Sequence, residues 1–413
     1  MTPEEKRKLF FESNPDIKET YENILRINDL GGYNITALEN IKKHAIKESP
    51  FYSRYTMEDK FPIMTKLDLI EHYKEIFCPK YKGNNLHRMS TSGSTGIPFT
   101  VEQDAGKRKR VIAELKVYGE YANQLSHECM VYFRALNGKT IDRSIDERDN
   151  IWRYDVSFLK DDTMLDLISF YEKHKPVIIF GYCSTIDTIT TYIKNNHIEL
   201  KHKPSSILVG SELLTQEVAD RIQSVFNCPI FDRYSNQEMG ILAQREVGKT
   251  DFRFNVASYH LEIIKLDKDE PCSEGELGRI VITDLYNKAF PMLRYDTGDI
   301  GSYILHDGKV YLKEVLGRRL DTIFDTKGRS RQPHMITNIM WGVNNIRQWQ
   351  FIQFSVKDYT IKISASGKVD EEDITLRLKT MLGEDANISI EYVDTIPVAN
   401  SQKRRYIVNM MKN

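Results

Sequence analysis

Hydroxyl side chains and glycines are concentrated in one short stretch that has the chemistry of an anion-binding loop. The stretch consists, in order, of Thr91, Ser92, Gly93, Ser94, Thr95 and Gly96. Glycine permits positive φ angles and close backbone approach, so successive N–H groups can surround an anion, and the hydroxyls add donors. The flanking residues favour strands, which predicts a strand–loop–strand element suited to a polyphosphate. The alternative for this stretch alone is a flexible Ser/Gly linker. A Walker A loop is excluded because no Lys follows Gly96.

Two further segments place polar chemistry at the ends of predicted strands. Gly210, Ser211 and Glu212 follow one strand, and Tyr234 and Glu238 in "YSNQEMG" follow the next. The carboxyl ends of strands border the ligand crevice of an open α/β sheet. A tyrosine ring offers a face for a nucleobase, and a glutamate is a hard ligand suited to Mg²⁺ on a phosphate chain. Taken alone, the first segment is better explained as an ordinary βα turn, and the second is equally compatible with a surface turn.

Charged residues in the later part of the chain extend this set. Asp296 and Asp299 lie in "LRYDTGDIG", where we expect a Gly-containing turn whose carboxylate accepts both ribose hydroxyls. The alternative is an Asx-type turn that satisfies its own backbone. Arg318 lies at a Gly-Arg junction and Lys403 lies near the C-terminus. Taken singly, these two residues are an ordinary basic linker and a solvated lysine.

Helical patterns dominate the first hundred residues. Leu38, Ile41 and Ala45 recur at helical spacing, which predicts one buried helix face. Thr65 is expected to be an N-cap, with Asp68 completing a capping box.

A further helix is predicted directly after the Ser/Thr/Gly stretch. Its apolar stripe is expected to comprise Val111, Leu115 and Tyr118. The charge run 107–110 is interpreted as a solvated first turn.

Strands and helices alternate from about residue 176, which indicates an α/β domain with a substantially parallel sheet. The pattern changes at Gly317, where strands, one helix and a last strand predict a compact α+β unit. The helix is expected to carry one apolar stripe, formed by Ile374, Leu378, Met381 and Leu382. We therefore expect an α/β fold: a large N-terminal domain, 1–316, with mixed and parallel sheets, and a small mobile C-terminal domain, 317–413.

The composition of the chain excludes some classes of binding partner and of protein. The 413 residues include 58 Lys and Arg against 59 Asp and Glu, so a net charge of −1 gives no electrostatic case for nucleic acid or an anionic membrane. No apolar run is long enough to span a bilayer, and the N-terminus lacks a signal peptide's apolar region. Five scattered cysteines without a C-x-x-C pair predict free thiols in a reducing cytoplasm.

These motifs, taken in order, resemble those of the adenylate-forming superfamily of acyl-CoA synthetases, peptide-synthetase adenylation domains and luciferases. Within it, the chain is similar to the phenylacetate–CoA ligase and capsule-biosynthesis (CapK-like) branch. The segments "HAIKESPFY" and "FPIMTKLDL" resemble the opening of that branch. The resemblance runs from about residue 38 to 407.

The resemblance implies a role for each matching position in nucleotide binding. Residues 91–96 would hold the β- and γ-phosphates of ATP, and residues 210–212 would border adenine, on which Tyr234 would stack. Asp299 would bind the ribose hydroxyls, and Arg318 would approach the ribose or a phosphate.

The resemblance also implies the catalytic residues. Glu238 would hold Mg²⁺, and Lys403, carried on the mobile domain, would reach the α-phosphate and the substrate carboxylate. Leu320 or Asp321 would be the interdomain hinge, where the family often has Asp or Lys at the first of these positions. The implied activity is adenylation of a carboxylic acid, followed by acyl transfer to coenzyme A.

Two alternatives remain open at this point. The acceptor could be an amine or sugar in surface-polysaccharide synthesis, giving an amide product. A non-catalytic nucleotide-binding homologue is the second alternative, because Ile97 and Phe99 flank Pro98 where the family often has a lysine. Without that lysine, pyrophosphate would be held mainly by backbone and hydroxyl donors.

Overall fold

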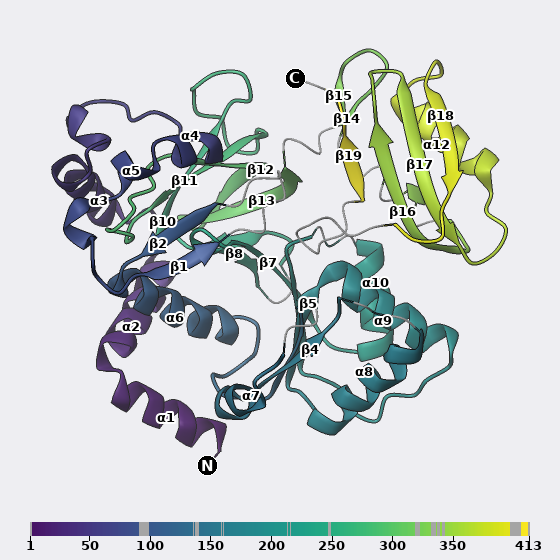
Figure 1. Ribbon diagram of the computed structural model, residues 1–413, viewed down its shortest axis with the longest axis horizontal. Coiled ribbons are helices and arrows are strands. Elements are labelled where there is room, and N and C mark those ends of the chain that lie inside the picture. Colours follow the sequence, from purple (N-terminus) through teal and green to yellow (C-terminus); the bar gives the residue numbers. More distant parts are fainter. Residues whose placement is uncertain are drawn as a thin grey trace.

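The computed structural model describes the chain with gaps, as residues 2–90, 99–134, 136, 140–157, 159, 161–212, 214, 216–246, 249–318, 323–331, 336, 339–340, 343–396 and 406–411. All statements below concern these residues (Figure 1). The loop 91–96, the hinge candidates Leu320 and Asp321, and Lys403 lie outside them.

Helices form the N-terminal segment. They are α1 (Pro3–Ser13), α2 (Pro15–Leu30), α3 (Ile35–Glu48), α4 (Lys66–Glu71) and α5 (Tyr73–Ile76). The predicted face of α3 is confirmed, because Leu38, Ile41 and Ala45 are its buried residues. The predicted capping box is also confirmed, since Thr65 accepts from the Asp68 N–H and Asp68 accepts from the Thr65 N–H.

One large sheet of eleven strands dominates the described chain, in the order β10-β11-β12-β13-β9-β8-β7-β6-β5-β3-β4. Its strands are β3 (Met130–Arg134), β4 (Ile151–Asp155), β5 (Ile178–Tyr182), β6 (Ser206–Gly210), β7 (Ile230–Asn236), β8 (Gly240–Arg245), β9 (Phe252–Phe254), β10 (Tyr259–Ile264), β11 (Gly278–Asp284), β12 (Tyr295–His306) and β13 (Lys309–Arg318). Strands β3 to β7 pair in parallel and the remainder pair antiparallel. The predicted α/β class is therefore confirmed.

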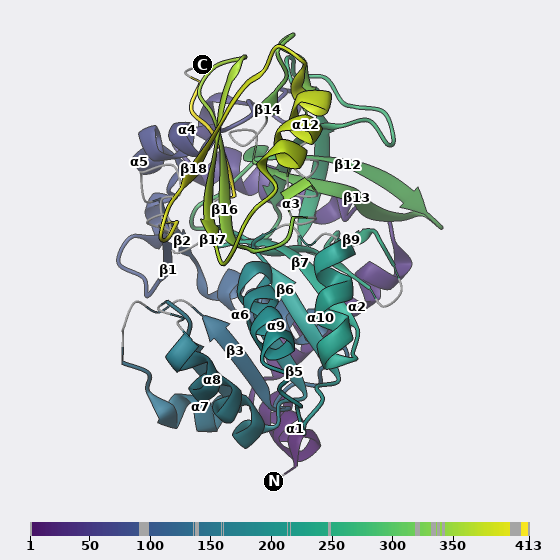
Figure 2. The same ribbon diagram turned by 90° about the vertical axis from the view of Figure 1, so that its right-hand side faces the viewer.

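Helices cover one face of the parallel half. They are α8 (Asp161–His174), α9 (Cys183–Asn195) and α10 (Gln216–Phe226), whereas α7 (Arg143–Asp149) contacts the edge strand β4. Figures 1 and 2 show α9 and α10 side by side on β5 and β6. Their apolar side chains form one buried cluster with alternate residues of the strands, among them Ile179, Ile207 and Val209. Alternate strand residues face the helices because side chains point to opposite sides of a pleated strand.

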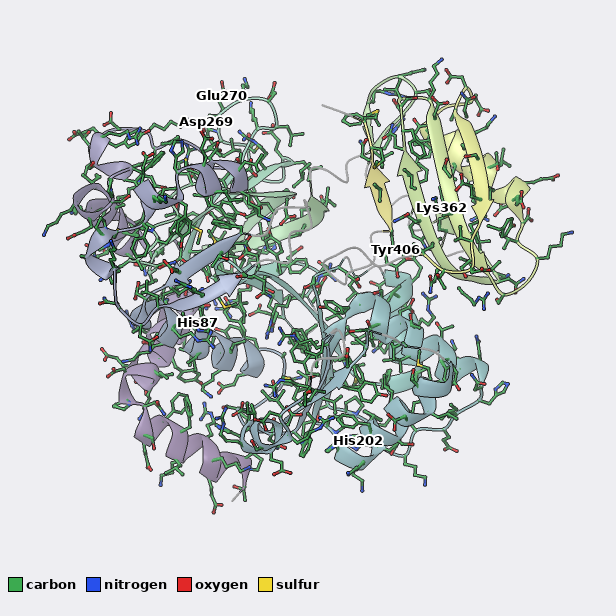
Figure 3. All side chains as sticks on the ribbon, in the orientation of Figure 1. His87, His202, Asp269, Glu270, Lys362 and Tyr406 are labelled. Carbon is green, nitrogen blue, oxygen red and sulfur yellow. The ribbon has the colours of Figure 1, made fainter. Side chains whose placement is uncertain are left out.

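The two strands of the predicted strand–loop–strand element are confirmed. β1 (His87–Ser90) and β2 (Thr100–Gln103) pair antiparallel, with Ser90 opposite Thr100. His87, labelled in Figure 3, lies on β1, and burial, followed by the charge of Arg108, lowers its pKa.

The prediction for that helix, α6 (Ala105–Glu120), is wrong about which face is buried. Lys107 and Arg110 of the supposed solvated turn are 0% and 4% exposed, whereas Leu115 of the supposed apolar stripe is 49% exposed. Of the other members of that stripe, Tyr118 is buried and Val111 is partly buried, as predicted. The charged face of α6 points inward because its polar partners, among them Tyr259 and Asp284, come from distant strands.

The C-terminal part forms a smaller α+β unit. It contains the short strands β14 (Ile323–Phe324) and β15 (Ser330–Arg331), and a four-stranded sheet in the order β18-β17-β16-β19. The elements of this unit are β16 (Ile346–Gln353), β17 (Asp358–Ala365), α12 (Glu371–Leu382), β18 (Asn387–Tyr392) and β19 (Ile407–Asn409). The predicted buried stripe of α12 is confirmed. The domain boundary at 316/317 falls inside β13 and stays a prediction, as does the mobility of the unit.

Candidate functional site

A hydrogen bond joins two predicted nucleotide-binding residues. The Tyr234 hydroxyl on β7 donates to Asp299 Oδ2 on β12 at 2.6 Å, and the Thr297 hydroxyl lies 3.3 Å away. Burial, followed by the Asp299 carboxylate, raises the pKa of Tyr234, so the phenol stays protonated and remains a donor. Strands β13, β9 and β8 lie between β12 and β7 in the sheet order, so the sheet must curl to bring the two side chains together.

Asp296 and Asp299 have different roles in the structure. Both lie in β12 rather than in the turn that we expected, with Gly298 between them at φ 79°. Asp296 accepts from the Gly298 N–H at 2.9 Å and forms an ion pair with Arg279 at 3.2 Å. The Asx-turn alternative therefore holds for Asp296, and Asp299 is the carboxylate that faces Tyr234.

Glu238 occupies the turn between β7 and β8. It is 8% exposed, and its Oε1 accepts from the Tyr295 hydroxyl at 3.3 Å. Across the described ranges no three His, Cys, Asp or Glu side chains cluster as a metal site. Mg²⁺ in nucleotide enzymes is commonly held by one or two carboxylates together with substrate phosphates. A single carboxylate at this turn fits a Mg²⁺ ion that arrives on ATP.

The buried face of α6 supports this turn. Lys107 Nζ donates to the Tyr259 hydroxyl at 3.0 Å, and that hydroxyl donates to the Met239 carbonyl at 2.7 Å. Lys107 also forms an ion pair with Asp284 at 2.9 Å, with both side chains fully buried. Gly240 has φ 124°, and a Cβ there would lie 3.1 Å from the Tyr259 hydroxyl. The turn that carries Glu238 therefore rests on a buried polar network.

Sequence reasoning missed this network, although a signal was present. Lys107, Arg110 and Glu114 recur at helical spacing, the pattern of one face. Glu114 is fully buried and burial raises the pKa of its carboxyl. Charged residues at helical spacing are normally read as solvated, because only the tertiary partners reveal that they are paired.

The segment 210–212 ends β6 at the carboxyl edge of the parallel strands. A Cβ on Gly210 would lie 3.2 Å from the Arg233 carbonyl, and Ser211 has φ 71°, so the backbone here is closely packed and strained. The Glu212 carboxylate accepts from the Ser184 N–H at 2.7 Å and from its hydroxyl at 3.0 Å. Glu212 thus caps the N-terminus of α9, and its contact with adenine stays a prediction.

Arg318 belongs to the same region through its backbone, because its Cα pairs with that of Asp299 between β13 and β12. The structure therefore brings together the ends of β6 and β7, the Glu238 turn, Asp299 and the Arg318 backbone. The roles of the loop 91–96 and of Lys403 stay predictions.

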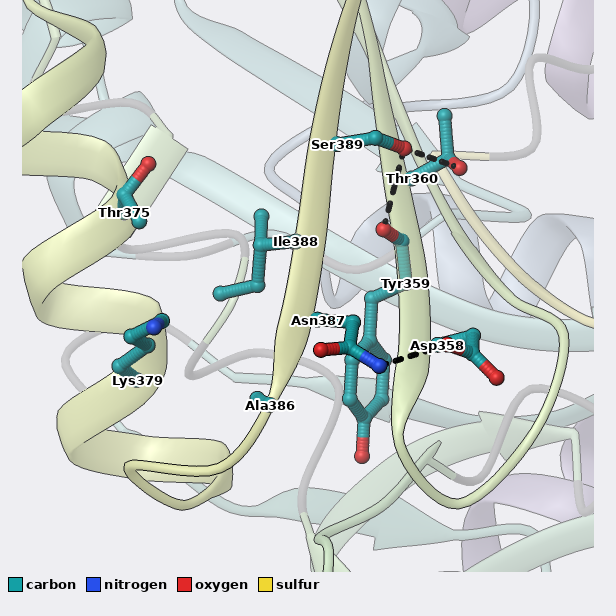
Figure 4. Close-up of a pocket in the computed structure, with 9 residues that line it drawn as sticks. All are labelled: Asp358, Tyr359, Thr360, Thr375, Lys379, Ala386, Asn387, Ile388 and Ser389. Carbon is teal, nitrogen blue, oxygen red and sulfur yellow. Dashed lines mark hydrogen bonds between the residues drawn. The ribbon is translucent and has the colours of Figure 1, made fainter.

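A pocket of about 470 Å³ lies elsewhere, between α12 and strands β17 and β18 of the small unit (Figure 4). Polar side chains dominate its lining, which includes Asp358, Thr360, Lys379, Asn387 and Ser389. None of the predicted site residues lines it. Within the described residues, no helix is long and apolar enough to cross a membrane.

The sequence is similar to those of known proteins. Residues 323–410 match the family model of the CapK C-terminal domain. The chain is 26% identical to protein CapK of Staphylococcus aureus over 438 aligned positions, covering 96% of this chain and 93% of that protein. It is 25% identical to the phenylacetate-coenzyme A ligase of Thermus thermophilus over 28% of this chain and 25% of that protein.

Solved structures share the fold. A 2-hydroxyisobutyryl-CoA ligase, crystallised in the postadenylation state with an acyl-AMP, superposes with a TM-score of 0.72 at 14% identity, covering 91% of this chain and 88% of that one. The chain is a CapK relative with the fold of the adenylate-forming ligases. The resemblance inferred from the ordered motifs is thereby confirmed, including its CapK-like branch. The expectation of a small C-terminal domain in this fold is confirmed as well.

Proposed function

We propose that this CapK relative is an ATP-dependent ligase that adenylates a carboxylic acid and passes the acyl group to coenzyme A. The observation that carries the proposal is the contact between Tyr234 and Asp299, two residues 65 positions apart that both have nucleotide roles in the motif order. The fold of the adenylate-forming ligases supports it independently.

The reaction needs alignment and charge neutralisation more than covalent chemistry. A substrate carboxylate attacks the α-phosphorus of ATP, the bond to the bridging oxygen breaks, and pyrophosphate leaves with its electron pair. Tyr234 and Asp299 would hold adenosine, and Glu238 would hold the metal. Bound Mg²⁺ would neutralise charge on the phosphate oxygens. Lys403 would stabilise the charge that develops at the α-phosphate.

The loop 91–96 would bind the departing pyrophosphate through backbone and hydroxyl donors. No lysine flanks Pro98, so Ser92, Ser94 and Thr95 would contribute a larger share of that binding. Acyl transfer then requires that the acceptor thiol reach the acyl carbon, where the thiolate sulfur displaces AMP. Withdrawal of Lys403 with a mobile C-terminal domain would open that path.

Acid-dependent exchange of labelled pyrophosphate into ATP tests the first step. The purified full-length chain with Mg²⁺ should catalyse exchange with at least one member of a panel of aryl, fatty and amino acids. ATP binding without exchange across the panel would instead favour a non-catalytic nucleotide-binding protein.

The acceptor requires its own test, because similarity to protein CapK over 96% of the chain favours the capsule-related alternative. In that alternative an amine nitrogen attacks the acyl-adenylate and an amide forms. We expect coenzyme A to accelerate AMP release and to give a thioester detectable by mass spectrometry. Acceleration by amines or amino sugars, with no effect of coenzyme A, would replace the thioester with the amide.

A further inference from the structure

Arg233 on β7 is a buried cation that has no carboxylate partner among the residues that the structure describes. It is 6% exposed, and its Nε donates to Gln244 Oε1 at 2.8 Å. No ion pair joins it to any Asp or Glu of the described chain; the adjacent carboxylate, Asp232, lies 4.0 Å from Arg245 instead. Burial lowers the pKa of Arg233 to about 10, which leaves it charged at neutral pH. A buried charge is costly unless it is paired, so this arrangement needs an explanation.

Other deeply buried arginines in or beside this sheet lie close to carboxylates. Arg253 and Arg294 are 7% and 6% exposed, and each contacts two carboxylates at 3.1 Å or less. Arg110, at 4% exposed, donates to the Ser258 hydroxyl and the Ala257 carbonyl and lies in the electrostatic field of Glu114. Arg233 differs because a single neutral amide oxygen is its hydrogen-bond acceptor in the described structure.

An aromatic stack lies beside the Arg233 guanidinium. Its Cζ lies 5.6 Å from the Phe180 ring, which stacks on Tyr132 at 4.6 Å with an interplanar angle of 19°. Arg134 adds a second cation, 5.8 Å from the Tyr132 ring. Tyr132 and Phe180 are partly exposed. The cluster formed by Tyr132, Arg134, Phe180 and Arg233 is therefore cationic and aromatic.

Gly210 lies next to Arg233 and Phe180 of this cluster. A Cβ at Gly210 would lie 3.8 Å from the Arg233 Cβ and 3.9 Å from Phe180 Cε2. A side chain at this position would therefore contact both Arg233 and Phe180. The cluster lies at the same carboxyl edge of β5, β6 and β7 as the residues assigned to the nucleotide.

Arg233 and Tyr234 are consecutive in β7, so their side chains project from opposite faces of the strand. If Tyr234 and Asp299 hold adenosine, Arg233 is directed toward a different part of the reactants. We propose that the acid adenylated here carries a second anionic group, bound by Arg233 beside the Tyr132–Phe180 stack, as in a dicarboxylic acid. This substrate class rests on the proposed function, because it assigns the acid side of the same site.

Pyrophosphate exchange with matched acids tests the specificity. Glutarate against butyrate, and isophthalate against benzoate, differ by one carboxylate. In the wild-type chain kcat/KM for the diacid should exceed that for its monoacid by about tenfold or more, as for a charge-assisted hydrogen bond. Arg233→Met should abolish this ratio, and Arg233→Lys should retain part of it, while KM for ATP stays within about twofold of wild type.

Thermal unfolding supplies a readout that does not depend on activity. Arg233→Met removes an unpaired buried charge and should raise Tm or leave it unchanged. In contrast, Arg253→Met leaves two carboxylates, Asp29 and Glu246, without their cation and should lower Tm. With MgATP present, glutarate or isophthalate should raise the Tm of the wild type more than the matched monoacid does. Arg233→Met should remove that difference.

Three results would overturn the proposal. An unchanged diacid preference in Arg233→Met would show that the guanidinium does not bind the second carboxylate of the acid. A rise in KM for ATP with every acid would assign Arg233 to the nucleotide, and a large fall in Tm would make it structural. Absence of exchange with all acids, together with a diacid-specific and Arg233-dependent Tm shift, would refute the ligase function and leave the anion site standing.

Discussion

The hydroxyl of Tyr234 donates to the carboxylate of Asp299 at 2.6 Å and joins two strands that three others separate in the sheet. A second bond, from Tyr295 to Glu238 at 3.3 Å, ties the same two regions together. The antiparallel half of the sheet therefore folds back toward the carboxyl edge of the parallel half. Residues expected to bind adenine, ribose and metal meet there because of that curl.

Substitution of Asp299 should weaken ATP binding selectively. Asp299→Asn removes the charge that would accept ribose hydroxyls, and loss of a charged hydrogen bond costs about 1.5–3 kcal/mol, so KM for ATP should rise about ten- to hundredfold. Steady-state exchange kinetics measure this. Asp296→Asn is the matched control, because that carboxylate is bound to Arg279 and the Gly298 N–H and should leave KM for ATP unchanged. Equal effects of the two substitutions would contradict the assignment of ribose to Asp299.

Lys403→Ala should lower acid-dependent pyrophosphate exchange by orders of magnitude, since it would remove the cation that stabilises charge at the α-phosphate. Lys362→Ala provides the control: Lys362 lies on β17 of the same unit and forms a surface pair with Glu391 at 3.6 Å. Exchange in that variant should match wild type. Full activity of Lys403→Ala would exclude Lys403 from adenylation.

The buried pair of Lys107 and Asp284 should be important for stability. Lys107→Met leaves Asp284 buried and uncompensated, which typically costs about 3–5 kcal/mol. Equilibrium urea unfolding measures the loss. Lys109→Met tests the same helix at its surface, where the pair with Asp16 is exposed to solvent and should contribute little to stability. Similar midpoints for the two variants would contradict the structural role of the Lys107 pair.

Asp232 should make the folded state less stable as pH rises. Burial raises the pKa of this carboxyl to about 7, above its usual value of 3.8, so the folded state holds a proton that the unfolded chain has lost. Its contribution is fully favourable below about pH 4 and is lost as pH rises toward 7, a change on the order of 4 kcal/mol. Asp232→Asn should flatten Tm between pH 5 and 8 relative to wild type. Parallel pH profiles would show that Asp232 titrates normally.

Much of the fold was predictable from local patterns. The α3 face, the Thr65 capping box, the β1–β2 pair and the buried stripe of α12 all followed from residue spacing or capping chemistry. These features are decided within a few residues, where helical and strand periodicity leave little choice. The inward face of α6 was not predictable, because the buried Lys107 donates a hydrogen bond to Tyr259, which is 152 residues away in the chain.

The candidate site was likewise predictable only in part. The sequence by itself determined the order of the motifs and the residue types available for binding a nucleotide. Only the tertiary structure decided that Asp299 rather than Asp296 faces Tyr234 and that the Glu238 turn rests on a buried lysine. It also decided that Arg233 pairs with no carboxylate in the described part of the chain. Local patterns show which groups a chain presents, but pairing and burial depend on contacts between distant segments, and those contacts decide which charges are free to bind a ligand.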